Sequence, residues 1–353
     1  MTARTDTAVG AGVQGASAVG AAAGESAEVL PPVLREGMDL VVDRVVEETA
    51  GIRSIAFVDP HGHDLPGYVP GSHLVLACRT AEGLRTNAYS LTGSGLFPEA
   101  YTISVLRESA GRGGSRWVHG LRSGDTVRVS RPRSAFPPVV NATHLLLVAA
   151  GIGITPILSH LRAALERGTP VTVLYVHRPG EGAHAQVVRD LVASTPGAEL
   201  VEYSDRHAFT EAFGTRVRRC SMGTHVFTCG PGPFMEAVEE TALAAGWPAA
   251  RIHSEAFGLA DLDPGTPFTA VLARSGDRVP VPAGVSLLEA LEGVGRSVPN
   301  MCRQGVCGEC RLKVTRGPVT HRDTYLSDEE KDRGDAVMCC VSRAATDEME
   351  IDL

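Results

Sequence analysis

Four cysteines near the C-terminus have the spacing of iron-sulfur ligands. Cys302, Cys307 and Cys310 form a Cys-x4-Cys-x2-Cys run, and Cys340 follows after twenty-nine residues. This is the ligand spacing of a plant-type 2Fe-2S cluster. A structural zinc site or a disulfide framework could also use four cysteines, but zinc ribbons usually pair their ligands two and two. The spacing therefore predicts a 2Fe-2S cluster and the transfer of single electrons.

The residues around these cysteines suit the same chemistry. Gly305 and Gly308 lie within the run, and glycine lets main-chain amides approach the cluster sulfurs. Cys340 is preceded directly by Cys339. Adjacent residues of an extended segment point to opposite sides, so only one of the two thiolates can face the iron. We expect Cys340 to be the fourth ligand.

Composition limits the class of protein and its partners. A chain of 353 residues should contain two or three domains. The net charge of −8, without a Lys/Arg-dense stretch, argues against a nucleic-acid partner. The remaining cysteines include the scattered Cys78, Cys220 and Cys229, as is usual in a reducing compartment, so we expect a cytoplasmic protein. The sequence contains no run of about eighteen apolar residues, which is the length that would predict a membrane span.

Elements that could position the cysteines follow from the sequence pattern. Residues 1–35 are rich in Ala and Gly and predict a disordered tail. Residues 36–140 contain short alternating runs between Gly/Pro turns, which predict an antiparallel β-barrel. The clearest of these strands are Leu40–Val46, His73–Cys78, Tyr101–Leu106 and Thr126–Ser130.

The second half of the chain predicts two further domains. Between residues 141 and 259, buried-strand runs alternate with helical stretches, which is typical of a parallel sheet that binds a nucleotide. A Pro/Gly/Asp-rich linker is expected at 260–267. Over 268–353, two strands and a helix precede the cysteine run, an order that suits an α+β ferredoxin domain of the β-grasp type. The fold class is therefore multidomain.

Two glycine-containing turns lie at strand ends of the middle domain. The run Gly151-Ile152-Gly153-Ile154-Thr155-Pro156 follows a strand and opens a helix, so Gly151, Gly153 and Thr155 could cradle a pyrophosphate. An ordinary tight turn is the alternative, because the third glycine of the dinucleotide fingerprint is absent. Cys229 and Gly230 form a second such turn on the carboxyl side of the same sheet.

These motifs occur in the order of a known family. From about residue 36 to the C-terminus, the chain resembles the ferredoxin-NADP reductase superfamily, and more closely the phthalate dioxygenase reductase family, which includes the vanillate demethylase reductases. The resemblance rests on the two turns above, the cysteine set that ends Cys340-Val341-Ser342-Arg343-Ala344, Ala88-Tyr89-Ser90-Leu91 and Gly113-Gly114-Ser115. It implies that the barrel binds flavin and that the middle domain binds NAD.

The resemblance assigns roles to residues of the barrel. In the family motif Arg-x-Tyr-Ser, Tyr89 would pack on the flavin and Ser90 would hydrogen-bond near its N5 atom. Asn87 stands where the family has arginine, and Arg85 is the alternative partner for the flavin phosphate. Gly113, Gly114 and Ser115 would bind the same phosphate at a helix start, unless they form only a turn capped by serine.

It also assigns residues of the middle domain. Cys229 would lie beside the nicotinamide, where it positions rather than attacks, although a lone buried cysteine can be simple core packing. Phe257 would stack against the flavin. Arg178 follows the second strand, where a cation could meet a 2′-phosphate. In the barrel, His73 is expected to be structural.

The implied function is an oxidoreductase. Electrons would pass from NADH through FMN and the 2Fe-2S cluster to a terminal oxygenase, such as a Rieske-type demethylase or dioxygenase. The C-terminal position of the ferredoxin domain indicates FMN rather than FAD within this family. A reductase partner of a cytochrome P450 and a non-enzymatic iron-sulfur redox sensor are the alternatives.

Overall fold

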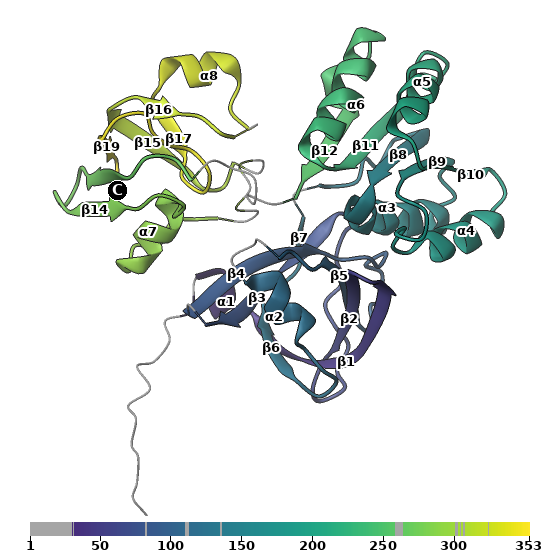
Figure 1. The fold of residues 1–353 in the computed structure, drawn as a ribbon, viewed down its shortest axis with the longest axis horizontal. Coiled ribbons are helices and arrows are strands. Elements are labelled where there is room, and N and C mark those ends of the chain that lie inside the picture. The colour runs from purple at the N-terminus through teal and green to yellow at the C-terminus, as the bar shows by residue number, and fades with distance from the viewer. Residues whose placement is uncertain are drawn as a thin grey trace, which may run out of the picture.

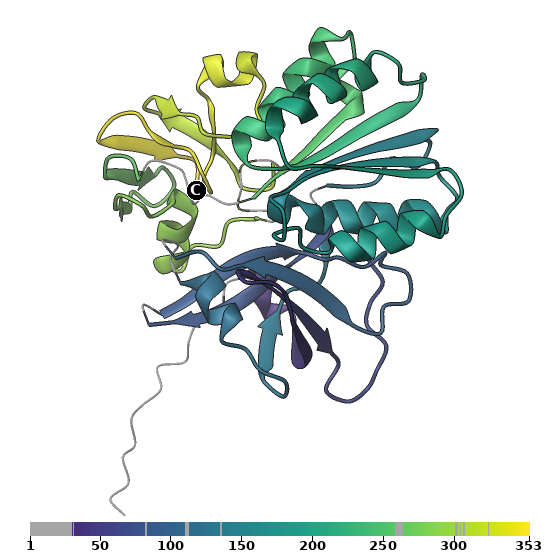
Figure 2. The same ribbon diagram turned by 45° about the vertical axis from the view of Figure 1, so that its right-hand side comes forward.

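The computed structural model describes residues 30, 32–81, 83–109, 113–134, 136–257, 264–300, 303, 305, 308–323 and 325–353. The predicted tail up to residue 29, residues 260–263 of the predicted linker, and both Cys302 and Cys307 lie outside these ranges. The described chain forms three parts, which both ribbon views show as separate bodies (Figures 1 and 2).

The first part is the predicted antiparallel barrel. Its strands pair in the order β4-β3-β6-β1-β2-β5, and β7 pairs with β3. An isolated bridge between Leu91 and Ile103 joins the end of β4 to β5, so the sheet closes on itself. The helices are α1 (Pro32–Arg35) and α2 (Gly114–His119). The strands are β1 (Met38–Thr49), β2 (Ile52–Val58), β3 (Ser72–Thr80), β4 (Gly83–Ser90), β5 (Tyr101–Leu106), β6 (Thr126–Val129) and β7 (Arg133–Ser134).

The second part is the predicted α/β domain. Its parallel sheet has the order β10-β9-β8-β11-β12. The strands are β8 (His144–Ala150), β9 (Val171–Val176), β10 (Ala198–Tyr203), β11 (Thr224–Gly230) and β12 (Ile252–Ala256). The helical elements are η1 (Gly151–Gly153), α3 (Ile154–Glu166), α4 (Ala185–Ala193), α5 (Arg206–Val217), α6 (Gly232–Ala244) and η2 (Ala249–Arg251). Every residue of β9 is buried, as expected for a parallel strand covered on both faces.

Helix α3 connects the sheet to the barrel (Figure 1). Ser159 Oγ donates a hydrogen bond of 2.6 Å to the carbonyl of Gly93, and Arg162 Nη1 donates one of 3.1 Å to the carbonyl of Thr92. Both carbonyls belong to the loop that follows β4. The carboxyl edge of the parallel sheet is thereby held close to the end of β4.

The third part has the predicted β-grasp arrangement. Its sheet has the order β14-β13-β19-β15-β17, in which β13 and β19 are parallel and the other pairs are antiparallel. Helix α7 begins after a capping box formed by Ser286 and Glu289. The elements are β13 (Phe268–Leu272), β14 (Arg278–Val281), α7 (Leu287–Gly293), β15 (Arg311–Arg316), β16 (Val319–Thr320), α8 (Asp328–Arg333), β17 (Ala336–Met338), β18 (Arg343–Ala344) and β19 (Glu348–Ile351).

One local prediction is wrong. Cys339 and Cys340 do not lie in an extended segment, because β17 ends at Met338 and the chain turns there. The amides of Val341 and Ser342 both donate to the Met338 carbonyl, over 3.1 and 3.0 Å. The helix after Gly113 begins at Gly114, which places Ser115 in its first turn.

Within the described ranges, the structure has no helix long and apolar enough to cross a membrane.

Candidate functional site

A buried hydrogen bond connects the barrel to the parallel sheet. Ser90, the last residue of β4, donates through Oγ to Oε2 of Glu255 in β12 over 3.3 Å. Both side chains are buried, with exposures of 5% and 4%. Burial raises the pKa of Glu255 to about 8, although the hydrogen bond from Ser90 acts in the opposite direction. At neutral pH this carboxyl group is therefore mostly protonated.

Cys229 lies beside the same carboxyl group. It is fully buried and is paired with Glu255 in the register of β11 and β12. Burial, and then the charge of Glu255, raise the pKa of the Cys229 thiol well above its usual value. A neutral thiol is a poor nucleophile, which agrees with a positioning role. Ser90 and Cys229 were both predicted, and the structure brings them together around Glu255.

Sequence reasoning assigned no role to Glu255. The sequence did contain a signal, since Glu255 is an acidic residue inside a strand of the sheet. A carboxyl group that is buried in such a place needs a hydrogen-bonding partner. Phe257 follows β12 directly and packs, half-buried, against the core cluster that contains Cys229. Its role against a flavin stays a prediction.

The two predicted phosphate turns meet each other. A Cβ atom on Gly153 would lie 2.2 Å from the carbonyl oxygen of Cys229, so only glycine permits this approach. Gly151 adopts a φ of +54°, and Thr155 Oγ1 donates to the Ile152 carbonyl over 3.1 Å. Both turns lie at the carboxyl edge of the sheet, where ligands of such folds bind. The residues present therefore fit a dinucleotide.

Three of the predicted flavin residues of the barrel share one face of β4. Arg85, Asn87 and Tyr89 alternate along the strand, as the register with β3 requires. Tyr89 Oη is buried, and no described residue lies within hydrogen-bond distance of it. Burial raises the pKa of Tyr89 strongly, so its hydroxyl stays protonated. A buried donor of this kind fits a polar ligand such as a flavin.

The start of α2 meets this strand. Asn87 Oδ1 would lie 2.2 Å from a Cβ atom on Gly114, so the two residues are in direct contact. The Ser115 hydroxyl accepts a hydrogen bond of 3.1 Å from the Glu108 amide and can still donate its own proton. Gly113, Gly114 and Ser115 thus lie next to Asn87, as a shared phosphate site requires.

In the β-grasp part, two of the predicted cluster ligands converge. Cys310 Sγ lies 3.1 Å from Cys340 Sγ. The Cys339 thiol also lies within hydrogen-bond reach of Cys310. Gly305 and Gly308 have φ values of +75° and +82°, a conformation that favours glycine. These residues fit an iron-sulfur cluster, and the participation of Cys302 and Cys307 stays a prediction.

The barrel contacts the segment that leads to the cysteine loop. Arg133 Nη1 donates a hydrogen bond of 3.4 Å to the carbonyl of Asn300. Arg133 is paired with His73 of β3, and the buried His73 is paired with Ser90. On the other side, the Asn300 Oδ1 atom accepts a hydrogen bond of 3.1 Å from Arg303. The flavin residues and the cysteine loop are therefore close in space.

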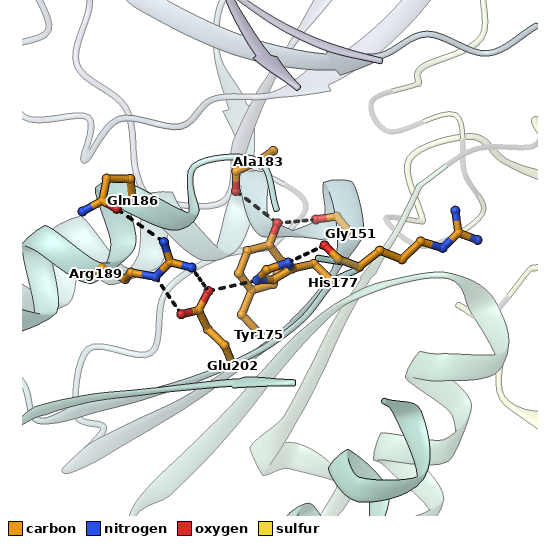
Figure 3. A network of polar contacts seen from close by, with 8 residues as sticks. Gly151, Tyr175, His177, Ala183, Gln186, Arg189 and Glu202 are labelled. Atoms are coloured by element: carbon orange, nitrogen blue, oxygen red, sulfur yellow. Dashed lines mark hydrogen bonds and ion pairs between the residues drawn. The ribbon is translucent and has the colours of Figure 1, made fainter. Parts of the chain in front are cut away.

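Charged residues gather at the end of β9 and β10 (Figure 3). Arg189 donates two hydrogen bonds of 2.7 Å to the carboxylate of Glu202, which also lies 2.9 Å from His177 Nε2. The hydrogen bonds from Arg189 lower the pKa of Glu202. The predicted cation Arg178 is largely exposed and forms an ion pair of 3.4 Å with Glu181.

Known proteins share both the fold and the motifs. A family model described as 2Fe-2S iron-sulfur cluster binding domain matches residues 271–345, and one described as dimethylamine monooxygenase subunit DmmA-like, N-terminal domain, matches residues 127–252. The haem-dependent oxidative N-demethylase beta subunit of Ectopseudomonas mendocina is 39% identical over 90% of this chain and 99% of its own length.

Phthalate dioxygenase reductase is also similar to this chain, both in sequence and in structure. The protein from Burkholderia cepacia is 35% identical over 86% of this chain and 93% of its own length. A solved structure of phthalate dioxygenase reductase matches with a TM-score of 0.75 and 33% identity, covering 92% of this chain and all of that chain. It is described as a modular structure for electron transfer from pyridine nucleotides to 2Fe-2S.

Fold and site together define a modular oxidoreductase with a flavin-type barrel, a nucleotide-binding domain and a 2Fe-2S ferredoxin domain. The chain belongs to the phthalate dioxygenase reductase-like family, whose members described above are components of oxygenase systems.

Proposed function

We propose that this protein is an NADH-dependent reductase that passes electrons through FMN and a 2Fe-2S cluster to a partner oxygenase. The observation that carries the proposal is the meeting of Ser90, Glu255 and Cys229 where the barrel joins the carboxyl edge of the parallel sheet. The cysteine pair lies in a separate part that contacts the same barrel through Arg133. This arrangement gives a two-electron site and a one-electron site in one chain.

The bound groups supply the redox chemistry: nicotinamide delivers a hydride, FMN converts it into single electrons, and the cluster passes these on. The protein holds the groups in order. Barrel residues would bind FMN, and the two glycine turns would bind the dinucleotide. The flavin set is Arg85, Asn87, Tyr89, Ser90, Gly113, Gly114, Ser115 and Phe257; the dinucleotide set is Gly151, Gly153, Thr155, Cys229 and Gly230; and the iron ligands are Cys302, Cys307, Cys310 and Cys340.

Ser90 and Glu255 would carry the proton that each turnover releases. A hydride is one proton and two electrons, and only the electrons continue to the cluster. The proton must leave from the place where the hydride arrived. Ser90 Oγ would lie there, and it is hydrogen-bonded to a carboxyl group whose pKa, about 8, is close to neutral pH. A pKa near the working pH suits a group that both takes and gives a proton.

The charges at the end of β9 and β10 favour NADH over NADPH. Arg189 is held by Glu202, and Arg178 is paired with Glu181. A 2′-phosphate at this edge would compete with the carboxylates of Glu202 and Glu181 for these cations. Its negative charge would also be repelled by both carboxylates. The test is the ratio of kcat/KM for the two nucleotides, and a preference for NADPH would refute this part of the proposal.

For the partner, the proposal is a haem-dependent oxygenase that demethylates an amine. The 39% identity to the beta subunit of such an N-demethylase, together with the match to the dimethylamine monooxygenase model, supports it. A Rieske-type oxygenase is the second candidate, because the phthalate dioxygenase reductase resemblance also spans the chain. The redox-sensor alternative gains no support from these relatives. We place the protein in the cytoplasm on its scattered cysteines.

Two measurements test the proposal. Denaturing the purified protein and chromatographing the released flavin should give FMN, and release of FAD would contradict it. The NADH-reduced protein should then be mixed with the oxygenase subunit of the N-demethylase of Ectopseudomonas mendocina or with a Rieske-type phthalate dioxygenase. Faster reduction of the haem supports the amine oxygenase, whereas faster reduction of the Rieske centre would overturn that choice of partner.

A further inference from the structure

Four polar side chains form a closed ring where the barrel meets the α/β part. Ser104 Oγ lies 2.7 Å from His184 Nε2 and 2.8 Å from Ser54 Oγ. Ser54 Oγ donates to Glu48 Oε1 over 2.7 Å, and Glu48 Oε2 lies 3.5 Å from His184 Nδ1. Glu48, Ser54 and Ser104 come from β1, β2 and β5 of the barrel, whereas His184 directly precedes α4. Side-chain contacts therefore connect the two parts here.

Three members of the ring are buried, and one of them has an uncommon backbone conformation. Ser54 and Ser104 are 5% exposed, His184 is 8% exposed, and the Glu48 side chain is 17% exposed. His184 has a φ of +56°, a left-handed conformation that is uncommon for residues other than glycine, although histidine adopts it more often than most. The contacts of the imidazole ring are the feature that explains why histidine stands at this position.

The hydroxyl hydrogens fix the direction of three of the four contacts. Ser54 Oγ donates to Glu48, so the contact between the two serines requires the Ser104 hydroxyl to donate. Ser104 Oγ then accepts in its contact with the imidazole, and His184 Nε2 is the donor. Nδ1 of the same ring faces Glu48 at 3.5 Å. Burial lowers the pKa of His184.

A second set of contacts links this ring to the dinucleotide turn (Figure 3). Tyr175 of β9 is fully buried, and its Oη atom lies 3.0 Å from the carbonyl of Ala183 and 3.2 Å from that of Gly151. Ala183 is the residue before His184, and Gly151 opens the predicted pyrophosphate turn. One phenolic hydrogen serves two carbonyl oxygens, so a shift of either carbonyl disturbs the other contact.

We propose that Glu48, Ser54, Ser104 and His184 form a polar latch that fixes the position of the Gly151 turn relative to the barrel. Through Tyr175, the latch sets the alignment of the nicotinamide with the flavin, so these are positioning residues of the hydride transfer. This inference rests on the proposed function. A displacement of about 1 Å between reacting groups can slow a reaction by about 100-fold, so a connection of this kind is enough to control the rate.

The test compares Ser104→Ala, Tyr175→Phe, His184→Gly and His184→Asn, with Gln186→Ala as the control. Gln186 is exposed, lies two residues after His184, and bonds to Asp190 and Arg189 rather than to the barrel. Asparagine tolerates the left-handed conformation and keeps an N–H donor, whereas glycine adopts this conformation readily and loses the donor. The readouts are the limiting rate of flavin reduction by NADH, the Kd of NADH, and hydrogen exchange of peptide 147–156 in the protein freed of flavin and nucleotide.

We expect Ser104→Ala, Tyr175→Phe and His184→Gly to slow flavin reduction by about tenfold or more, with Kd changed by less than about twofold. The same variants should exchange amide hydrogens of peptide 147–156 faster. His184→Asn should recover most of the rate, and Gln186→Ala should match the wild type. In the double variant of Ser104→Ala and Tyr175→Phe, the losses should be less than multiplicative, because both act through one connection.

Two results would overturn the latch. One is a His184→Gly variant with the wild-type rate, which would mean that the imidazole only fills space. The other is unchanged hydrogen exchange at 147–156 in both Ser104→Ala and Tyr175→Phe. If NADH failed to reduce the flavin of the wild-type protein, the proposed function would be wrong, and the exchange measurement would still decide whether the latch holds the turn.

Discussion

Ser90 Oγ and Glu255 Oε2 lie 3.3 Å apart, and this contact joins the last residue of a barrel strand to the edge strand of the parallel sheet. The residues are 165 positions apart in the sequence. The contact places a protonated carboxyl group between the predicted flavin residue and the predicted nicotinamide residue, Cys229. It is the relationship on which the proton route depends.

Replacing Glu255 by glutamine should change how stability depends on pH. The pKa of Glu255 is about 8 in the folded protein and about 4.5 in the unfolded chain, so between these values the folded state holds a proton that the unfolded state has released. The free energy of unfolding then falls as pH rises, by at most about 1.4 kcal/mol per pH unit. Glu255→Gln lacks this contribution. Urea unfolding at pH 5, 6.5 and 8 should show the variant gaining stability relative to the wild type, and a constant difference would contradict the assignment.

Replacing Cys229 by alanine should slow hydride transfer more than it weakens nucleotide binding. The thiol is fully buried, and the carbonyl of the same residue contacts Gly153, so we expect loss of the thiol to change the geometry of the reacting groups rather than the binding surface. We expect flavin reduction to slow by about tenfold or more and the Kd of NADH to change by less than about twofold. Anaerobic stopped-flow measures both quantities. An unchanged rate with an intact flavin would return Cys229 to a packing role.

Cys340→Ser should lose the visible absorption of the 2Fe-2S cluster, and Cys339→Ser should keep it. The 3.1 Å contact of Cys340 with Cys310 supports this choice, since cluster ligands must converge. Cys339 and Cys340 both lie near Cys310 in a turn rather than in an extended segment. Strand geometry therefore does not choose between the two thiols. Absorption spectra of the two purified variants decide the matter, and the opposite pattern would make Cys339 the ligand.

Arg133→Ala should slow electron transfer from flavin to cluster without affecting reduction of the flavin. Its hydrogen bond to the Asn300 carbonyl joins the barrel to the cysteine loop. A net contribution of about 0.5–1.5 kcal/mol implies that its loss lowers the docking equilibrium constant by about two- to thirteenfold. Arg131→Ala removes the same charge two residues earlier and is the matched control. NADH-driven reduction of ferricyanide, which can take electrons from flavin, should stay normal in both variants, and equal cluster reduction in both would refute the role of Arg133.

The sequence predicted the elements better than the contacts between them. The run His144–Ala150 is apolar after its first residue, and the structure contains a strand with the same bounds that is buried from Leu145 onward. The three fold types were likewise recognisable, because each rests on local periodicity and on motifs within a short stretch of chain. The cysteine spacing predicted the cluster for the same reason.

Contacts between distant residues were not predictable in this way. Glu48 and His184 belong to different parts, and no local pattern links a carboxylate in one strand to a histidine before a helix. In the sequence, nothing distinguishes Glu255 from an exposed acidic residue, because its burial depends on the other parts of the chain that cover its strand. The turn at Cys339 also depends on tertiary structure, since the Cys339 amide donates to the Cys310 carbonyl over 3.2 Å. Tertiary hydrogen bonds therefore determine features of this structure that local sequence propensity does not predict.

The central claim is that electrons from NADH reach the cluster only through the flavin. It is tested most directly with protein from which the flavin has been removed while the cluster is retained. Under anaerobic conditions, NADH should leave the cluster of this protein oxidised, as followed by its visible absorption and electron paramagnetic resonance, whereas dithionite should reduce it. Addition of FMN should restore reduction by NADH. Reduction of the cluster by NADH in the flavin-free protein, at the rate of the complete protein, would contradict the account.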